Sequence, residues 1–213
     1  MKVLSILVLF AVIALGCTKH EEAIKVADSA ESYGPIVRLH FASTGRFFCS
    51  GTVISATKVL TAGHCVAAAA GFMGIARDKI SVRSANGAVI DDAAEPLSAE
   101  QRSDQGLVIG NFAKAEQAIM ITDSSRNIEL WGNSKLISCG FPFGGKLFCI
   151  PMKNQKQFNF GWSANSFLYP GMSGGPVFDS FTGAIVGINS AVREELSIFA
   201  TTLEIFANLN VSE

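Results

Sequence analysis

The sequence predicts an all-β fold. Short apolar runs bounded by turn residues recur at close, regular intervals along the 213 residues, 20 of which are glycine, and no stretch keeps a long helical periodicity. This pattern is typical of a β-barrel or a β-sandwich. Apolar residues make up 49% of the chain and charged residues 16%, a balance that indicates a compact globular protein with a sizeable core.

The charge pattern argues against two kinds of partner. Seventeen basic and eighteen acidic residues are scattered along the chain without long runs. A surface that binds nucleic acid or anionic lipid needs a cluster of basic side chains. We therefore expect no nucleic-acid partner and no electrostatic binding to a membrane.

Residues 1–16 have the form of an export signal. Met1-Lys2 precedes an apolar stretch from Val3 to Ile13, and small residues come before Cys17. The apolar stretch is shorter than the roughly 20 residues that cross a bilayer. The end of the signal resembles a bacterial lipoprotein box, which implies cleavage before Cys17 and lipid modification of that residue. Residues 14–16 also suit an ordinary signal peptidase, which would leave Cys17 as a free or disulfide-bonded cysteine.

The lipoprotein interpretation predicts an exported protein held by lipid at the cell membrane or the outer membrane. Residues 17–33 are polar and charged, so we expect them to form a tether. The folded domain is then expected over residues 34–213.

The domain begins with a predicted strand in which Val37, Leu39 and Phe41 alternate with Arg38 and His40. A helical turn is expected near residues 67–70. The three-to-four residue spacing of Leu203, Phe206 and Leu209 predicts a short C-terminal helix. Further strands are expected at residues 51–55, 58–61, 80–83, 106–109, 136–139, 176–178 and 184–189.

The cysteines predict two disulfides. When Cys17 is set aside, four cysteines remain in a chain exported to an oxidising compartment, and three connectivities are open. Cys139 and Cys149 flank a turn-rich stretch that can return the chain as a hairpin, so we pair them. That leaves Cys49 with Cys65. No spacing typical of a zinc site is present, and we expect no metal.

The run from Gly171 to Pro176 (GMSGGP) carries the most chemical information. Its glycines permit a tight loop that exposes Ser173 and aims successive backbone N–H groups at one point. If Ser173 attacks a carbonyl, the N–H groups of Gly171 and Ser173 are the expected donors to the oxyanion. A hydroxyl nucleophile needs a neighbouring base to take its proton.

The chain offers three histidines as that base. His20 lies in the tether and His40 in an ordinary strand. His64 follows an apolar strand in the run LTAGHC, so we assign the base to His64.

The residues around His64 and Ser173 resemble those of one family. The runs Cys49 to Ile54 (CSGTVI) and Val59 to Cys65 (VLTAGHC) are similar to the histidine segment of trypsin-like serine peptidases, and the serine loop matches the same family. Both motifs stand in the family's order. Within that family, the sequence is more similar to bacterial HtrA-like and glutamyl endopeptidases than to digestive enzymes.

The resemblance implies a fold of two six-stranded antiparallel β-barrels. It also implies a Cys49–Cys65 disulfide and a His-Asp-Ser triad that works without a cofactor. The acid that orients His64 should lie between the two motifs, where Asp91, Asp92, Asp104 and Asp123 compete. Asp104 precedes an apolar strand, as the family's aspartate does. We choose Asp104 and keep Asp92 as the reserve.

Met172 departs from members of the family that are activated by cleavage. Those enzymes have an aspartate just before the serine, which pairs with a newly freed amino terminus. Met172 cannot make that ion pair, so no switch of that kind is expected.

For the substrate, the resemblance implies a pocket with Phe167 near its base and Asn189 and Ser190 along its wall. Ordinary packing is an equally good interpretation of Phe167 and Asn189. An acidic residue is missing there, which argues against Lys or Arg at the cleavage site, because a buried cation would lack a partner. We expect a small or apolar side chain instead.

Together these observations predict a secreted, membrane-anchored serine endopeptidase that acts on proteins or peptides. One alternative is a catalytically inactive surface-binding lipoprotein of the same fold. Another is an esterase, which is disfavoured because the chain lacks a Gly-x-Ser-x-Gly elbow in an alternating βα pattern.

Overall fold

A computed structural model of the chain describes residues 34–71, 76–100, 104–117, 136–153, 156–158, 161–164, 166–180, 183–193 and 196–201. The predicted signal, the tether, the C-terminal helix, Cys17 and Asp123 lie outside these residues. None of the helices in the described ranges is long and apolar enough to cross a membrane.

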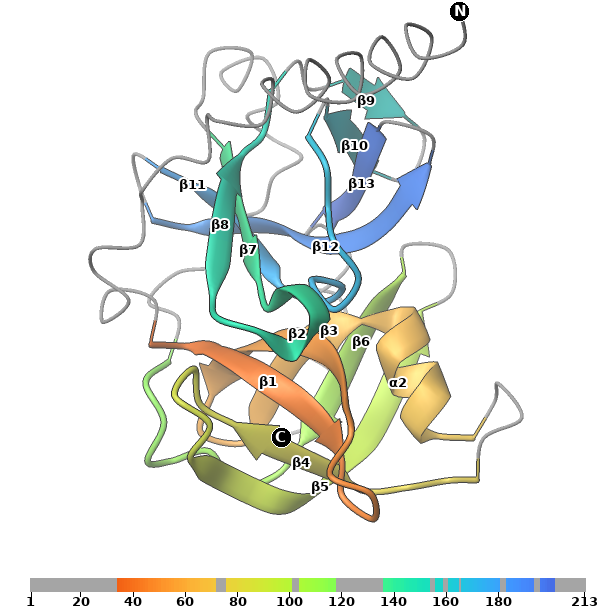
Figure 1. Cartoon of the computed structure of the whole chain (residues 1–213), viewed down its shortest axis with the longest axis vertical. Coiled ribbons are helices and arrows are strands. Elements are labelled where there is room, and N and C mark those ends of the chain that lie inside the picture. Colours follow the sequence, from red (N-terminus) through yellow and green to blue (C-terminus); the bar gives the residue numbers. More distant parts are fainter. Residues whose placement is uncertain are drawn as a thin grey trace, which may run out of the picture.

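The first half of the described chain is a closed barrel, in the lower part of Figure 1, with the strand order β1-β2-β3-β6-β5-β4. Each pair of neighbouring strands is antiparallel. Helix α2 (Gly63–Ala69) follows β3 directly and packs against β5 and β6. The strands are β1 (Ile36–Phe41), β2 (Phe47–Ser55), β3 (Lys58–Ala62), β4 (Ile80–Arg83), β5 (Val89–Glu100) and β6 (Gln105–Ile109).

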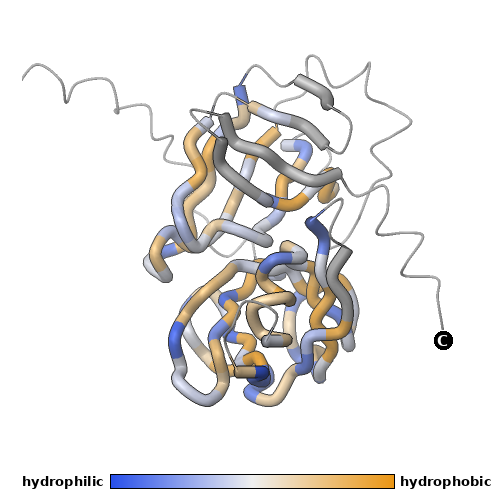
Figure 2. The backbone as a smooth tube through the Cα atoms, turned by 90° about the vertical axis from the view of Figure 1, so that its right-hand side faces the viewer, coloured by the Kyte–Doolittle hydropathy of each residue, from blue (hydrophilic) through white to orange (hydrophobic). Residues whose placement is uncertain are grey.

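The barrel is filled by the apolar face of its strands. Val37, Leu39 and Phe41 are buried, whereas Arg38 and His40 between them are partly exposed, which confirms the alternation predicted for β1. Figure 2 shows apolar stretches in the barrel strands, which appear there as the lower ring. Burying one Val, Leu or Phe side chain stabilises a fold by about 1.5–3 kcal/mol, so this core is the main support of the first half.

The second half is a seven-stranded sheet with the order β8-β7-β11-β12-β13-β10-β9, in the upper part of Figure 1. Its strands are β7 (Leu136–Gly140), β8 (Phe148–Pro151), β9 (Lys156–Phe158), β10 (Gly161–Ala164), β11 (Pro176–Asp179), β12 (Ile185–Arg193) and β13 (Leu196–Thr201). Within the described residues the edge strands β8 and β9 do not pair, and the sheet is not closed. The all-β class and the first barrel are therefore confirmed, and the second predicted barrel is not.

The two halves meet where the serine loop, residues 170–175, passes over the barrel. Leu60 of β3 and Leu107 of β6 form one buried cluster with Ile188 of β12. The backbone N–H of Ser50 in β2 donates to the carbonyl of Ser173 at 2.8 Å. The loop that leads into β11 is thus attached to a barrel strand as well as to its own sheet.

Both predicted disulfides are present, Cys49–Cys65 and Cys139–Cys149. The first joins β2 to α2 beside His64. The second joins directly opposed residues of β7 and β8 and closes the hairpin that contains the short turn η3 (Pro142–Gly144). Each bridge thereby fixes a segment that borders the serine loop.

Candidate active site

His64 is the second residue of α2, and Asp104 holds the start of that helix. The residue before α2, Ala62, has no side-chain group to cap it. Instead, the Asp104 carbonyl accepts from the Gly63 N–H at 2.8 Å, and its Oδ1 accepts from the His64 N–H at 2.8 Å. The first N–H groups of a helix lack partners within the helix, so Asp104 supplies acceptors that this helix needs.

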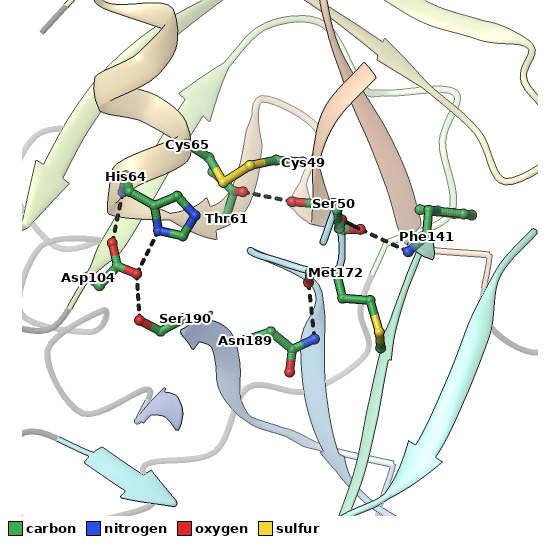
Figure 3. The surroundings of a disulfide bond; sticks show 11 residues. Cys49, Ser50, Thr61, His64, Cys65, Asp104, Phe141, Met172, Asn189 and Ser190 are labelled. Atoms are coloured by element: carbon green, nitrogen blue, oxygen red, sulfur yellow. Dashed lines mark hydrogen bonds and ion pairs between the residues drawn. A yellow bond between two sulfur atoms is a disulfide. The ribbon is translucent and has the colours of Figure 1, made fainter. Parts of the chain in front are cut away.

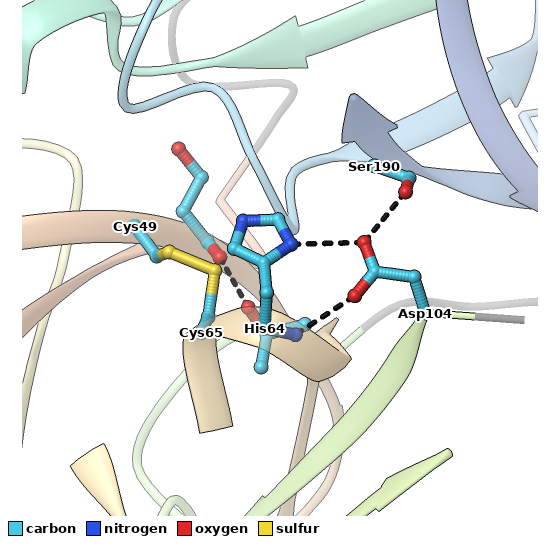
Figure 4. Close-up of polar contacts among 7 residues, drawn as sticks. Cys49, His64, Cys65, Asp104 and Ser190 are labelled. Carbon is cyan, nitrogen blue, oxygen red and sulfur yellow. Dashed lines mark hydrogen bonds and ion pairs between the residues drawn. A yellow bond between two sulfur atoms is a disulfide. The ribbon is translucent and has the colours of Figure 1, made fainter. Parts of the chain in front are cut away.

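The imidazole of His64 and the carboxylate of Asp104 also meet directly, as Figure 4 shows. His64 Nδ1 lies 2.9 Å from Asp104 Oδ2. An ionised carboxylate only accepts hydrogen bonds, so the proton of a neutral ring belongs on Nδ1 and Nε2 becomes the acceptor. The side chain of His64 is 42% exposed and that of Asp104 is 26% exposed. This arrangement leaves the imidazole more exposed than the carboxylate that it contacts.

Ser190 of β12 is a third member of this group. Its Oγ donates to Asp104 Oδ2 at 2.5 Å. Burial raises the pKa of Asp104 and is the largest single influence on it. The hydrogen bond and charge of His64, the Ser190 hydroxyl and the His64 backbone N–H act in the opposite direction, and together they hold this pKa below its usual value. Asp104 therefore stays ionised beside the imidazole.

The backbone at Asp104 adopts a left-handed conformation, with φ of +49°. Asp tolerates this region better than most residues, although it still costs energy. The residue accepts four hydrogen bonds in this conformation, one through its carbonyl and three through its carboxylate. These bonds offset the backbone cost and hold the side chain against His64.

Every carbonyl from Pro170 to Ser173 is bonded to a neighbouring donor. Pro170 O accepts from the N–H of Phe143, and Met172 O accepts from the N–H of Gly175 and from Asn189 Nδ2. The Gly171 and Ser173 carbonyls bond to Ser50, through its hydroxyl and its backbone N–H respectively. Figure 3 shows Ser50, Met172 and Asn189 gathered beside the Cys49–Cys65 disulfide.

The same loop leaves two N–H groups without an acceptor in the described part of the chain, those of Gly171 and Ser173. The N–H groups of Met172, Gly174 and Gly175 are bonded. In a trans peptide the C=O and the following N–H point in opposite directions. Because the carbonyls that precede Gly171 and Ser173 are held, both free N–H groups are turned the other way. These are the two donors expected from the sequence.

Glycine is required at two positions of the loop. Gly171 has a φ of +94°, and a Cβ there would lie 2.7 Å from Phe141 O. Gly174 has a φ of +79°, and a Cβ there would lie 2.0 Å from Thr61 Oγ1 and 2.8 Å from the nitrogen of Ala62. The close approach of Gly174 to β3 puts the serine loop beside the start of α2.

Ser173 is partly buried and directly precedes Gly174 in the chain. Between the described residues no hydrogen bond joins Ser173 to His64. In serine hydrolases this hydrogen bond is often long or poorly aligned before substrate is bound.

The three predicted substrate residues have different surroundings. Phe167 is 51% exposed and packs edge-on against Tyr169, so its contact with substrate stays a prediction. The side chain of Asn189 is 0% exposed and both Nδ2 hydrogens and Oδ1 are bonded, so the described structure does not support its predicted contact with substrate. The Ser190 hydroxyl bonds to Asp104, and the contact of Ser190 with substrate stays a prediction.

The other candidates lie away from this group. Asp92 is exposed on β5. The Asp91 carboxylate accepts from the backbone N–H groups of Ala93 and Asn111. His40 lies near the end of β1, and its Nδ1 is hydrogen-bonded to Gly45 O in the turn that follows. Of the described candidates, only Asp104 contacts His64.

The His64 ring and the sulfur atoms of Cys49 and Cys65 lie within 4.8 Å of one another. Thiolates bind metals, but these two sulfur atoms are joined in a disulfide. The group therefore lacks the ligands of a zinc or copper site.

A family comparison agrees with this geometry. The family model of the trypsin-like peptidase domain matches residues 49–188. This chain belongs to the trypsin-like peptidase family. No curated protein matches its sequence significantly.

Solved structures share the fold of this trypsin-like peptidase domain at low identity. The inactive form of the Rv3671c protease of M. tuberculosis is 16% identical with a TM-score of 0.63, over 84% of this chain and 89% of that one. The HtrA-type protease AlgW, solved with a tripeptide, is 16% identical with a TM-score of 0.63, over 83% and 59%. A serine endoprotease of Yersinia pestis is 18% identical with a TM-score of 0.60, over 83% and 62%.

Several residues of this trypsin-like site were not found from its sequence. Ser50 follows a motif cysteine, and its place in the CSG run is the signal that could have found it. Arg38 gives no such signal, although its guanidinium donates to Gly144 O and Gly145 O at 2.7 Å each. It thereby ties β1 to the turn that carries Phe143.

Proposed function

We propose that this chain is an exported serine endopeptidase in which Ser173, His64 and Asp104 form the catalytic triad. The observation that carries the proposal is the His64–Asp104 pair beside a loop in which two N–H groups have no acceptor among the described residues. A base with a fixed tautomer and a preformed anion site are the two features that acyl transfer from a serine requires.

The reaction follows from these positions. Ser173 Oγ attacks the peptide carbonyl while its proton passes to His64 Nε2, and the ionised Asp104 stabilises the resulting imidazolium. The carbonyl oxygen becomes an oxyanion that the Gly171 and Ser173 N–H groups bind. The tetrahedral species collapses, the C–N bond breaks, and His64 gives its proton to the leaving amine. Water then attacks the acyl-enzyme with the same base and releases Ser173.

The anion site is expected to supply much of the rate. Removing one oxyanion donor typically slows acyl transfer by about 100- to 1,000-fold. Both donors here are backbone groups whose preceding carbonyls are bonded, so the site needs little rearrangement when charge develops.

For the substrate we propose a peptide with a small or apolar residue at the cleavage site. Phe167 and Tyr169, whose ring centroids lie 5.1 Å apart, present aromatic surface next to the loop that carries Ser173. For the location we propose an export signal over residues 1–16 and a lipid on Cys17, which rest on the sequence alone.

The test is covalent labelling of the exported chain, purified in detergent, with a fluorophosphonate, read by intact mass. One adduct is expected on the wild type and none on Ser173→Ala or His64→Ala. The matched control is His40→Ala, which removes a histidine outside the site and should label as the wild type does. A mass increase from acyl groups that Cys17→Ser abolishes would support the anchor.

A second candidate is a catalytically inactive binding lipoprotein. The observation that favours it is the lack of a hydrogen bond between Ser173 and His64 among the described residues. It predicts folded protein that takes no adduct at any concentration of the reagent. An adduct that requires both residues excludes it.

A further inference from the structure

Asn189 is a buried residue whose side-chain amide is hydrogen-bonded at both its nitrogen and its oxygen. It lies in β12 with its side chain 0% exposed. Its Nδ2 donates to Cys139 O at 2.9 Å and to Met172 O at 3.1 Å, and its Oδ1 accepts from Ser138 Oγ at 2.6 Å. The carbonyls of Cys139 and Met172 can only accept, so the amide nitrogen must face them. The Ser138 hydroxyl can donate, so the amide oxygen faces it, and the orientation of the amide is fixed.

The bond to Met172 acts on the catalytic loop, as Figure 3 shows. Met172 O belongs to the peptide that joins Met172 to Ser173. Holding this carbonyl on the β12 side turns the Ser173 N–H to the opposite side, because the peptide is planar and trans. That N–H has no acceptor in the described residues. The amide of Asn189 therefore sets the direction of one of the two oxyanion donors.

The loop has no charged residue that could do the same work. Met172 is fully buried and apolar, so it cannot anchor the loop through an ion pair. Asn189 supplies neutral hydrogen bonds from the neighbouring strand instead. Neutral bonds of this kind do not depend on a new amino terminus and do not titrate.

We propose that Asn189 is a positioning residue that orients the Ser173 N–H for oxyanion binding and makes the serine loop competent without proteolytic activation. The inference rests on the proposed function. It assigns Asn189 a role in kcat through Met172, with no contact to substrate.

The backbone of Asn189 explains why this role can be tested. Its N–H donates to Gly175 O and its carbonyl accepts from the Gly174 N–H, each at 2.8 Å. These two bonds hold β12 against the loop whatever side chain residue 189 carries. A change of the side chain therefore acts mainly on the carbonyls of Met172 and Cys139. Met172 O still accepts from the Gly175 N–H at 3.0 Å when the amide of Asn189 is removed. The substitution therefore loosens the loop without removing all of its hydrogen bonds.

The first variant is Asn189→Leu in the full chain, which keeps a similar volume and removes both donors. We expect kcat on a peptide substrate to fall by about 10- to 100-fold, less than the loss of a whole oxyanion donor. KM should stay within about threefold, because transition-state stabilisation alone is lost. The midpoints of the pH–rate profile should not move, because the His64–Asp104 pair is untouched. Ser138→Ala, which leaves both Nδ2 donors, is the matched control and should retain most of kcat.

Active-site titration with the fluorophosphonate normalises each rate to folded, reactive protein. An unchanged kcat per reactive site in Asn189→Leu would overturn the inference, since the amide would then be structural only. A raised KM with kcat unchanged would also overturn it, because Asn189 would then act on substrate binding. If the leucine variant does not fold, Asn189→Ser decides the question: it keeps one short donor and should show a smaller fall in kcat with the same KM.

The two proposals fail in different ways. If the wild type neither labels nor hydrolyses peptides, the proposed function is wrong and this inference falls with it. If the wild type is active and the folded variants keep its kcat, only the role of Asn189 is wrong.

Discussion

The carboxylate of Asp104 is hydrogen-bonded to His64 at two points. Its Oδ2 lies 2.9 Å from the imidazole Nδ1, and its Oδ1 lies 2.8 Å from the backbone nitrogen of the same residue. One carboxylate therefore fixes both the start of α2 and the direction of the ring. The tautomer of the base and its position depend on the same side chain.

Asp104→Asn tests this coupling. The amide keeps the shape and still tolerates the left-handed backbone, but its NH₂ group can oppose Nδ1–H and favour the wrong tautomer. We expect kcat to fall by about 1,000- to 10,000-fold, with KM within about threefold. The measurement is steady-state hydrolysis of a peptide substrate. Asp92→Asn, on the exposed part of β5, is the control, and an equal loss there would reject Asp104 as the acid.

The pH dependence of stability gives an independent test. The pKa of Asp104 is lower in the folded than in the unfolded chain, where an aspartate titrates near about 3.9. The unfolded state therefore binds more protons as the pH falls. The contribution of Asp104 to the free energy of unfolding is complete above about pH 5 and is lost as the pH drops through the folded-state pKa.

Urea unfolding between about pH 3 and pH 6 measures this contribution. The wild type should lose more stability than Asp104→Asn over the acid part of that range. Parallel curves for the two proteins would show that the His64 and Ser190 contacts do not hold the carboxylate ionised.

Gly171→Ala should block the anion site. Its Cβ would lie 2.7 Å from both Phe141 O and Phe47 Cε1, on a backbone with φ of +94°. Labelling by the fluorophosphonate should slow by more than about 100-fold, because the Gly171 N–H is displaced. Gly183→Ala is the matched control, since that residue has a φ of +71° and nothing within 4 Å of the added Cβ. It should cost only the conformational strain of about 1–2 kcal/mol and leave the labelling rate unchanged.

Arg38→Met should lower kcat, because Arg38 connects β1 of the barrel to the turn beside the serine loop. The guanidinium donates to Gly144 O and Gly145 O and lies 4.5 Å from the centre of the Phe141 ring. Its loss frees the turn whose Phe143 N–H holds Pro170 O at 2.7 Å. We expect kcat to fall by about tenfold, as small misplacements of a catalytic donor do.

Arg46→Met is the control for that variant, because the Arg46 guanidinium lies over the Phe41 ring at 5.2 Å, away from the serine loop. Equal kcat values for both variants in peptide hydrolysis would show that the turn held by Arg38 does not position the serine loop. Thermal unfolding of each variant separates a change in kcat from partial unfolding.

The sequence predicted the strands that obey a simple pattern. β1 alternates, and β3, β6 and β12 are apolar runs, so each was located from local composition. β5 was missed because Val89–Glu100 mixes acidic, alanine and proline residues, and its strand conformation comes from pairing with β4 and β6. β9 and β10 are short and defined by their partners in the sheet. Tertiary pairing, which composition does not encode, decides such segments.

The site was predictable where its residues lie in continuous motifs. His64 and Ser173 stand in recognisable runs, and Asp104 precedes an apolar strand. The contacts of Asn189 and Ser190 were missed because they depend on the register of β12, in which Ile188 opposes Pro176. That register turns Asn189 inward to the loop and Ser190 toward Asp104. Residue type alone does not distinguish these directions from the wall of a substrate pocket.

The Cys49–Cys65 disulfide links the segment that carries His64 to the strand that holds the Ser173 loop. Cys65 follows His64 in the chain, and Cys49 precedes Ser50, whose N–H and hydroxyl hold the carbonyls of Ser173 and Gly171. His64 and Ser173 come from different halves of the molecule, yet one bridge and the residues beside it connect them. The spacing between His64 and the serine loop therefore depends on this bridge and on the hydrogen bonds of Ser50 more than on the strands that lie far from them.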